Sequence, residues 1–253
     1  MHTVLITGGS EGIGLAFARL FAADGHKVII AAKDMMKLSD AVHMLQKEYH
    51  AKVKAAAIDL SVSGSGSVLY EKFKDAGVDV LINCAGLGYT EVSWQIPAAA
   101  DEALIGVNNT ALMTLTKLFL KDMCEKRNGI ILNVASTGAF QPGPYIASYY
   151  ASKSFVLSYT RAVAQEAREY GVHVHCLCPG PVDTAFYTKS GVPRPRTAMS
   201  AEKCALYAYK RLNGRKTVLV PGFLNKAVRL LPVSWRMRWV ASNKKKLIEK
   251  KKR

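Results

Sequence analysis

Residues 3–21 read TVLITGGSEGIGLAFARLF and pass from an apolar, β-branched segment through a glycine-rich turn into a segment with helical spacing. Glycine permits positive φ and close approach of the backbone to a ligand, and the amide groups that begin the following helix can bind phosphate. Any tight strand-to-helix turn needs glycine, however, so the turn alone is weak evidence for a nucleotide site. Its spacing is GxxxGxG rather than GxGxxG.

Apolar, β-rich segments alternate with amphipathic segments of helical length up to about residue 220. This alternation is typical of a parallel sheet covered by helices on both faces. We therefore expect an α/β fold of the Rossmann type, with a doubly wound, seven-stranded parallel sheet. The predicted strands are 2–7, 27–32, 53–58, 78–83, 129–135, 172–178 and 216–220. The predicted helices are 12–24, 35–49, 66–76, 98–127, 149–170 and 200–213.

The charge is distributed unevenly along the chain. Residues 1–209 carry 20 Lys/Arg against 18 Asp/Glu, whereas residues 210–253 carry 15 against 1. We expect one catalytic domain over residues 1–220 and a basic, amphipathic, helical extension over residues 221–253. At 253 residues and 49% hydrophobic, the chain can bury a core without disulfides or a structural metal. Its five cysteines show no zinc spacing, which favours reduced thiols in a reducing compartment.

The basic extension favours a membrane surface as a partner. Ser234 is a predicted N-cap, and Trp235 and Trp239 share a face of the helix that follows, beside basic residues. Such a helix suits the headgroup region of an anionic bilayer. A subunit or lid helix with a solvated basic end is the alternative, and nucleic acid is not expected because no aromatic-basic platform is evident. With no secretory signal and no apolar run of about 18 residues, we expect a cytoplasmic protein, peripheral on the cytoplasmic face of a membrane.

Two segments, one loop and one predicted strand, are candidate functional sites because of their position or composition. Residues 186–200 contain Pro193 and Pro195, which disfavour one long helix, and they follow the carboxyl end of a predicted strand. We predict a mobile substrate lid there, with an ordinary surface loop as the alternative. Residues 173–178 read HVHCLC, but the strand period of two sends the histidines and cysteines to opposite faces, so we expect no metal site.

The end of the second predicted strand bears on cofactor choice. An acid there would accept from the ribose 2′-hydroxyl of NAD, whereas a base would bind the 2′-phosphate of NADP. Ala32 occupies the position of the acid and Lys33 follows it, so the sequence favours NADP(H) over NAD(H), although Asp34 weakens the inference. Asp59 is placed to accept from the adenine amino group or to cap a turn.

Tyr149 and Lys153 are four residues apart in a predicted helix and therefore share a face. An ammonium beside a phenol favours the phenolate, and such a cation, helped by an oxidised nicotinamide, would bring the pKa of tyrosine, ordinarily about 10, closer to neutrality. A Tyr-x-x-x-Lys pair alone is common on helix surfaces. Ser136, just past the fifth predicted strand and thirteen residues before Tyr149, makes the pair more informative.

Taken together, these residues resemble the classical short-chain dehydrogenase/reductase family, from Thr3 to about Val220. The resemblance rests on Thr7-x-x-x-Gly12-x-Gly14, Asn83-Cys84-Ala85-Gly86, Val107-Asn108, Ser136, Tyr149-x-x-x-Lys153 and Pro179-Gly180-Pro181-Val182-Asp183-Thr184. Two departures are Cys84, where Asn is commoner, and Glu11, where many NADPH users carry Arg or Lys.

The resemblance implies roles for individual residues. The catalytic set would be Asn108, Ser136, Tyr149 and Lys153: Asn108 holds a kinked helix and a relay water, Ser136 orients the carbonyl, Tyr149 transfers the proton and Lys153 binds the nicotinamide ribose. The implied cofactor-binding residues are Thr7, Gly8, Ser10, Gly12, Ile13, Gly14, Lys33, Asp59, Leu60, Asn83, Ala85, Gly86, Tyr149, Lys153, Pro179, Val182 and Thr184.

The expected activity is hydride transfer between a nicotinamide cofactor and a carbonyl or secondary alcohol. A weaker resemblance of the C-terminal segment, to very-long-chain 3-oxoacyl-CoA reductases and 17β-hydroxysteroid dehydrogenases, suggests NADPH-dependent reduction of a hydrophobic ketone, either a 3-oxoacyl thioester or a ketosteroid. The family also implies a homo-oligomer. The alternative is a non-catalytic scaffold that binds NADPH and acts through its basic tail.

Overall fold

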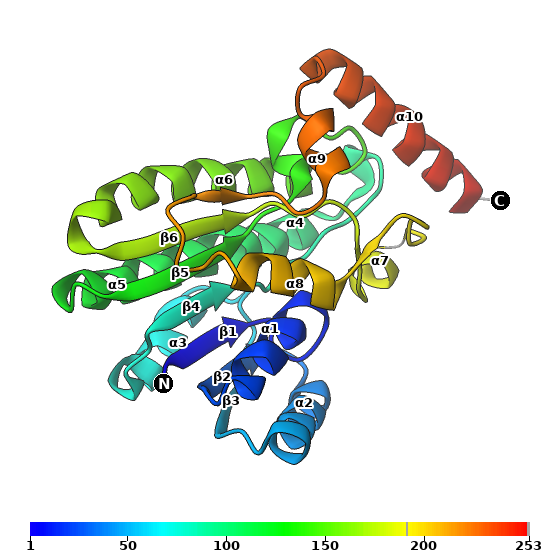
Figure 1. Ribbon diagram of the computed structural model, residues 1–253. Helices are drawn as coiled ribbons and strands as arrows, with labels where there is room; N and C mark the ends of the chain where they lie inside the picture. Colours follow the sequence, from blue (N-terminus) through cyan, green and yellow to red (C-terminus); the bar gives the residue numbers. More distant parts are fainter. Residues whose placement is uncertain (191, 252–253) are drawn as a thin grey trace.

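The computed structural model describes residues 1–190 and 192–251. Within this part of the chain a seven-stranded, wholly parallel sheet is covered by helices on both faces (Figure 1). The strand order is β3-β2-β1-β4-β5-β6-β9, so the winding direction reverses between β1 and β4. The predicted fold class is confirmed. The strands are β1 Thr3–Thr7, β2 Lys27–Ala32, β3 Val53–Ala57, β4 Val80–Asn83, β5 Gly129–Val134, β6 Val172–Leu177 and β9 Val218–Leu219.

The helices divide between the two faces of the sheet. Successive strand residues alternate between two apolar cores: Ile6 packs in the same core as Phe17 of α1, and Leu5 packs in the same core as Phe119 of α5. Because both faces are covered, the strands read as continuous apolar segments. One face carries α1 Gly12–Ala23, α2 Met35–Tyr49 and α8 Ala201–Tyr209; the other carries α3 Ser65–Phe73, α5 Leu112–Glu125 and α6 Ala147–Ala167.

The predicted helix 98–127 is interrupted. It consists of α4 Ala98–Ile105, a π-helical turn Gly106–Ala111 and α5. Together Ala98–Glu125 is long and apolar enough to cross a membrane by length and composition alone, with a mean hydropathy of 1.3, but half of this window is buried inside the protein. We therefore interpret it as a core helix of the fold.

A buried polar network joins the sheet to two helices. The Asn83 amide of β4 donates to Asn133 Oδ1 of β5 at 2.9 Å and to Thr116 Oγ1 of α5 at 3.1 Å. The Asn133 amide in turn donates to Thr160 Oγ1 of α6 at 3.1 Å. All four side chains are buried, where an unpaired polar group costs about 1–3 kcal/mol. The network therefore fixes α5 and α6 against the two central strands.

Strand β6 shows the expected alternation of His and Cys. The buried His175 ring nitrogens lie 3.0 Å from the Lys216 carbonyl oxygen and 2.7 Å from that of Leu212. Cys176 and Cys178 belong to a separate apolar cluster beneath α6, with their sulfur atoms 3.7 Å apart.

The predicted lid is more regular than expected. Of residues 186–200, residue 191 lies outside the described residues; the segment contains a short helix, α7 Phe186–Lys189, and a strand, β8 Met199–Ser200. Strand β8 pairs with β7 Val182–Asp183 in a small parallel sheet. The prolines lie between α7 and β8, so they end the helix without excluding one before them.

The C-terminal extension is helical, as predicted, and contains α9 Phe223–Val228 and α10 Val233–Lys251. Its last two residues, 252–253, lie outside the described residues. The predicted N-cap at Ser234 is wrong, because α10 already begins at Val233. The Pro232 carbonyl accepts from the Trp235 and Arg236 amides at 3.1 and 3.2 Å, which places the start of the helix two residues earlier than predicted.

Candidate active site

The glycine turn between β1 and α1 has the shape of a phosphate cradle. Gly8 and Gly12 have φ values of 66° and 56°, which L side chains rarely adopt. A Cβ on Gly14 would lie 2.2 Å from the Gly8 carbonyl oxygen. Helix α1 begins at Gly12, and its N-cap, Glu11, makes no side-chain capping hydrogen bond in the described structure. The amide groups of the first turn are therefore available to an anion, and the turn fits a dinucleotide pyrophosphate.

The ends of β1 and β4 are joined beside this turn. Thr7 Oγ1 accepts hydrogen bonds from the Cys84 and Ala85 amides at 3.1 and 3.2 Å. A Cβ on Gly12 would lie 3.0 Å from Thr184 Cγ2, so the segment after β6 closes the other side of the cradle. These contacts bring the carboxyl ends of β1 and β4 together with the segment after β6, at the point where the strand order reverses.

Some predicted cofactor residues have their side chains turned into the protein. The Asn83 amide is part of the buried network, Leu60 is buried in the core shared with Phe119, and Val182 in the core shared with Phe17. The Pro179 carbonyl accepts from the Thr137 amide at 2.8 Å, which positions the segment that follows Ser136. At these positions the side chains, and the Pro179 carbonyl, stabilise the protein around the site. Ser10, Ile13 and Gly86 remain predictions for cofactor contact.

The structure brings the predicted catalytic residues together. Ser136 follows β5, and its hydroxyl shares a hydrogen bond with the Tyr149 hydroxyl at the start of α6. Ser136 Oγ also accepts from the Gly138 amide at 3.0 Å. One turn after Tyr149, the buried Lys153 ammonium donates to the Val134 carbonyl at 2.9 Å. Thus β5 and α6 present a hydroxyl pair with a cation beneath it.

Asn108 lies within the π-helical turn, and its side chain holds that turn to the strand-end loop. Its Oδ1 accepts from the Leu87 amide at 2.8 Å, and its Nδ2 donates to the Leu87 carbonyl at 2.9 Å and to Ser152 Oγ at 3.0 Å. A Cβ on Gly86 would lie 3.4 Å from Lys153 Nζ and 3.5 Å from Asn108 Oδ1. The kinked helix implied by the resemblance is therefore present, with Asn108 at the kink.

Burial determines the protonation state of Tyr149. Burial raises the pKa of Tyr149 above its ordinary value, outweighing the hydrogen bond with Ser136, which lowers it. Burial lowers the pKa of Lys153 to about 8. The Lys153 nitrogen lies 5.7 Å from the Tyr149 ring centre, and the Phe186 ring packs on Tyr149 at 5.2 Å between centres. The apolar environment thus keeps Tyr149 protonated at neutral pH, and the phenolate favoured by Lys153 together with an oxidised nicotinamide stays a prediction.

Helix α7, at the start of the predicted lid, forms an apolar wall next to Tyr149. A Cβ on Gly88 would lie 2.6 Å from the Phe186 ring, so the lid and the loop after β4 approach closely at this glycine. The rings of Phe186 and Tyr187 meet edge to face at 6.1 Å, and burial raises the pKa of Tyr187 to about 12. Sequence reasoning missed Phe186, whose only signal is its place at the start of the predicted lid.

Asp59 has the turn-capping role that was one of its two predicted alternatives. It accepts from the Ser61 amide and hydroxyl at 3.0 and 2.6 Å, and Lys33 Nζ lies 2.6 Å from its carboxylate. The hydrogen bonds from Lys33 and Ser61 lower the pKa of Asp59 to about 2. The adenine contact of Asp59 remains a prediction, and the ammonium of Lys33 is held beside this carboxylate.

Sequence reasoning missed an ion-pair cluster at the glycine turn. Glu11 pairs with Lys37 in the first turn of α2, at 2.9 Å, and with Lys189 of α7. Burial raises the pKa of Glu11, but the hydrogen bonds and charges of the two lysines outweigh it and hold the pKa below its ordinary value. The paired residues are 26 and 178 positions apart in sequence, so no local sequence pattern predicts the ion pairs. They link the lid, α2 and the glycine turn.

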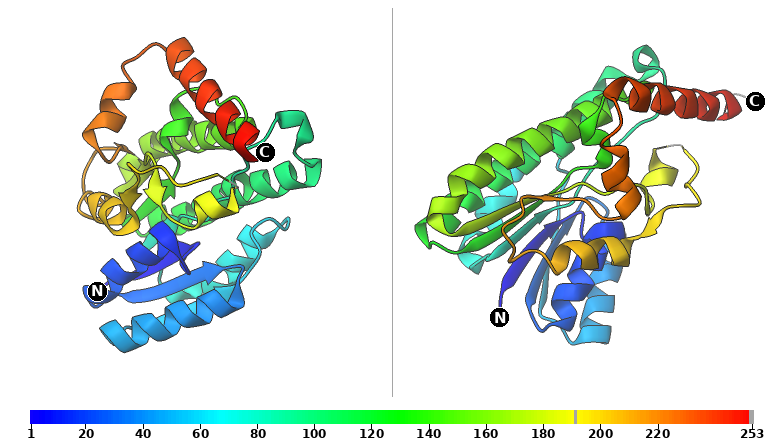
Figure 2. Two further views of the ribbon diagram at one scale, coloured as in Figure 1. Left: turned by 90° about the vertical axis from the view of Figure 1, so that its right-hand side faces the viewer. Right: turned by 45° about the horizontal axis from the view of Figure 1, so that its top comes forward.

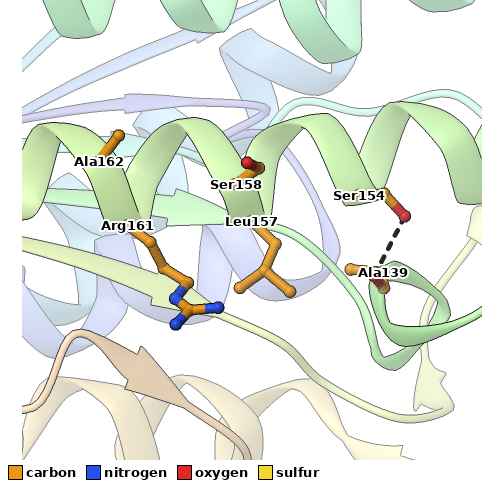
Figure 3. Close-up of a pocket in the computed structure, with 6 residues that line it drawn as sticks. All are labelled: Ala139, Ser154, Leu157, Ser158, Arg161 and Ala162. Atoms are coloured by element: carbon orange, nitrogen blue, oxygen red, sulfur yellow. Dashed lines mark hydrogen bonds between the residues drawn. The ribbon is translucent and has the colours of Figure 1, made fainter.

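A hollow of about 430 Å³ lies along α6, outside the candidate active site (Figure 3). Figure 3 shows the Leu157 and Arg161 side chains extending to the same side of the helix, and Ser154 Oγ donates to the Ala139 carbonyl at 3.0 Å. It includes none of the predicted catalytic residues. Its lining residues are Ala139, Ser154, Leu157, Ser158, Arg161 and Ala162.

Comparisons with known proteins identify the family of this chain. The short chain dehydrogenase family model matches residues 2–193. Very-long-chain 3-oxoacyl-CoA reductase of Pyrenophora tritici-repentis is 32% identical over 212 residues, covering 78% of this chain and 61% of that protein's length. Hydroxysteroid dehydrogenase-like protein 1 of Gallus gallus is 28% identical over 256 residues, covering 97% of this chain and 76% of the relative.

The solved structures include a short-chain dehydrogenase from Sphingobium yanoikuyae in complex with NADPH. It is 27% identical, with a TM-score of 0.83, and the match covers 98% of this chain and 96% of that one. The range matched by the family model includes the glycine turn and the residues Ser136, Tyr149 and Lys153. The chain belongs to the short-chain dehydrogenase/reductase family.

Proposed function

We propose that this protein reduces a hydrophobic ketone with NADPH, the ketone being a 3-oxoacyl thioester or a ketosteroid. The observation that carries the proposal is the hydrogen-bonded Ser136 and Tyr149 pair, with Tyr149 protonated beneath the apolar wall of Phe186. A protonated phenol is ready to donate, and an apolar wall favours an apolar substrate. The named relatives support this substrate class, with the 3-oxoacyl-CoA reductase matched over 61% of its length.

Each residue of the candidate active site has its own role in the proposed reaction. A bound nicotinamide supplies the hydride. Ser136 and Tyr149 donate hydrogen bonds to the substrate oxygen as negative charge develops on it, and Tyr149 then gives up its proton. The Lys153 ammonium, one helical turn away, stabilises the phenolate left on Tyr149. Asn108 keeps the π-helical turn fixed against Leu87, beside Lys153.

For the cofactor, we propose that Lys33 and Lys37 bind the 2′-phosphate of NADP(H). Lys33 follows β2, Lys37 lies in the first turn of α2, and their side chains are 76% and 45% exposed. In the free protein each ammonium is paired with a carboxylate, Asp59 or Glu11, which raises the pKa of both lysines. A phosphate dianion can replace these carboxylates as the partner of the lysines.

Replacing both Lys33 and Lys37 by Ala is expected to raise the KM for NADPH by about 10- to 100-fold, since hydrogen bonds to charged groups contribute about 1.5–3 kcal/mol each before the carboxylate pairs they replace are counted. The KM for NADH is expected to change little. Steady-state kinetics with both cofactors measures the effect, and Lys47→Ala, at the far end of α2, is the matched control. Equal changes for NADH and NADPH would refute the proposed role.

The substrate class is tested by cofactor oxidation with 3-oxoacyl thioesters of several chain lengths, ketosteroids and small diketones. We expect NADPH-dependent turnover with one hydrophobic class. Tight NADPH binding without turnover of any member of the panel would favour the scaffold alternative. That alternative has less support, because a binder needs the glycine cradle but not the Ser136, Tyr149 and Lys153 arrangement.

We further propose a cytoplasmic homo-oligomer. All five cysteines are free thiols, which agrees with a reducing compartment. On the outer side of α6, Phe155 is 41% exposed and stacks on Tyr159 at 5.8 Å between ring centres. An apolar face of this kind suits contact with a second copy. Sedimentation velocity of the full chain and of Phe155→Ser is expected to show an oligomer that the substitution weakens; a monomeric full chain would overturn this proposal.

A further inference from the structure

Six large apolar side chains of the C-terminal extension are exposed to solvent. They lie in α9, in the turn that follows it and in the first two turns of α10, and we call them the apolar crest. Their exposed fractions run from 47% to 88%. The crest consists of Phe223, Leu224, Leu230, Leu231, Trp235 and Trp239. Both helices lie at the end of the molecule opposite α2 (Figures 1 and 2). A concentration of exposed apolar residues in 17 consecutive positions marks an interaction surface.

The rest of the protein holds α10 in one orientation. Arg236, Val240 and Ile248 recur at helical spacing and are buried, with exposed fractions of 7%, 3% and 6%. Arg236 Nη1 donates to Gln141 Oε1 at 2.8 Å, which ties the inner face of the helix to the segment after Ser136. The helix cannot rotate Trp239 inward without exposing these residues. The crest therefore stays on the outside of the folded chain.

The charge around the crest selects its partner. The extension belongs to residues 210–253, whose 15 basic residues against 1 acidic residue contrast with a nearly neutral body. Lys226, Arg229, Arg238, Lys245 and Lys246 lie among or just beyond the crest residues in sequence. A second copy would bring the same positive charge, so self-association through this face is disfavoured. A nucleic acid would match the charge but would offer no apolar phase to the leucines.

We infer that the apolar crest inserts into the headgroup region of an anionic lipid bilayer while the neighbouring lysines and arginines bind lipid phosphates. Indole rings suit the boundary between headgroups and acyl chains, and each basic residue near the surface adds to the attraction. Both properties belong to one continuous segment of α9 and α10. The membrane thus accounts for the exposed apolar side chains and for the charge together.

This docking would place the active-site cleft next to the bilayer. The Arg229 guanidinium lies 3.9 Å from the centre of the Phe140 ring, and Arg236 bonds Gln141; both partners follow the predicted catalytic Ser136 by a few residues. At the other end of the extension, a Cβ on Gly180 would lie 2.4 Å from Asn225 Oδ1. We extend the inference, which at this point rests on the proposed function, to the substrate: a ketone dissolved in the membrane would enter the active site beside the extension.

Binding is tested by sedimenting the full chain with phosphatidylcholine vesicles and with vesicles that also contain phosphatidylglycerol. We expect cosedimentation mainly with the anionic vesicles. The double variant Leu230→Ser, Trp239→Ser is expected to weaken it by tenfold or more, since burying each large apolar side chain contributes about 1.5–3 kcal/mol. Replacing Arg238, Lys245 and Lys246 by Gln is expected to weaken it by about fivefold per charge at low salt.

The matched control is Met36→Ser, Val68→Ser, which removes two apolar side chains that are 80% and 62% exposed on α2 and α3. It is expected to bind vesicles like the parent, and thermal unfolding checks that all variants fold. Equal binding to both vesicle types, or no loss in the crest variant, overturns the inference. So does binding to duplex DNA that matches the vesicle affinity and is unaffected by Leu230→Ser, Trp239→Ser.

The vesicle assay does not depend on turnover, so it separates this inference from the proposed function. If the chain binds anionic vesicles but reduces no ketone, the substrate proposal fails and the docking surface stands. If it reduces long-chain ketones in detergent without binding vesicles, the docking surface fails and the reductase stands. When both hold, anionic vesicles are expected to stimulate reduction of a membrane-dissolved ketone more than that of a small, water-soluble diketone.

Discussion

Replacing Tyr149 by Phe is expected to lower kcat for ketone reduction by about 10²- to 10⁴-fold, the usual contribution of a positioned general acid. The phenylalanine ring keeps the contact with Phe186 at 5.2 Å, so the fold and cofactor binding should be retained. Only the proton donor and its hydrogen bond with Ser136 are removed. Steady-state turnover at saturating NADPH, together with cofactor binding by fluorescence, measures the loss.

Tyr150→Phe is the matched control. The Tyr150 ring packs on Gly138 and Gly143, where added Cβ atoms would lie 2.9 and 2.4 Å from it, and Ser154 instead of lysine lies four residues on. Its hydroxyl is therefore expected to matter little for kcat. Full turnover by Tyr149→Phe would defeat the assignment of Tyr149 as the proton donor.

Replacing Lys153 by Met is expected to lower kcat/KM by about 10²- to 10³-fold, because the variant loses the cation that stabilises the phenolate. The parent enzyme should also lose kcat/KM as the pH rises above about 8, the value to which burial lowers the pKa of Lys153. Below that pH the lysine is charged and active; above it the lysine is neutral. A pH profile of both enzymes measures the effect, and the fall near pH 8 should be absent from the variant.

The titration of Lys153 is expected to raise the stability of the folded protein as the pH rises, whereas it lowers kcat/KM. The pKa of Lys153 is lowered in the folded state, to about 8 from 10.5, so the free energy of unfolding gains a contribution as pH rises between these values. In Lys153→Met this pH-dependent contribution is absent. Denaturant unfolding across that pH range measures it. A fall in kcat/KM above pH 8 that persists in the variant would show that another group titrates there.

The sheet and the glycine turn could be predicted because their signals are local. Strands that are buried on both faces appear in the sequence as continuous apolar segments. The positive φ values at Gly8 and Gly12 require glycine at those positions. Tyr149 and Lys153 share a helix face by spacing alone. Ser136 joined them because it follows the neighbouring strand β5, and strand ends of a parallel sheet meet at one edge.

The rest depends on contacts between distant parts of the chain. The π-helical turn arises where Asn108 bonds Leu87, which no pattern within residues 98–127 reveals. The raised pKa of Tyr149 follows from burial beside Phe186, a residue that the sequence places in a loop. Likewise Lys189 of α7 pairs with Glu11 of the glycine turn, which lies 178 residues away in sequence.

The buried network of Asn83, Thr116, Asn133 and Thr160 constrains how this sequence can diverge. An apolar substitution at any one position leaves a buried partner unpaired, whereas joint replacement by apolar residues of similar shape can be nearly neutral. Simultaneous substitution of all four residues is therefore less destabilising than substitution of one residue alone. Descendants of this chain should exchange all four residues or keep all four, because they hold α5, which follows the π-helical turn of Asn108, and α6, which carries Lys153.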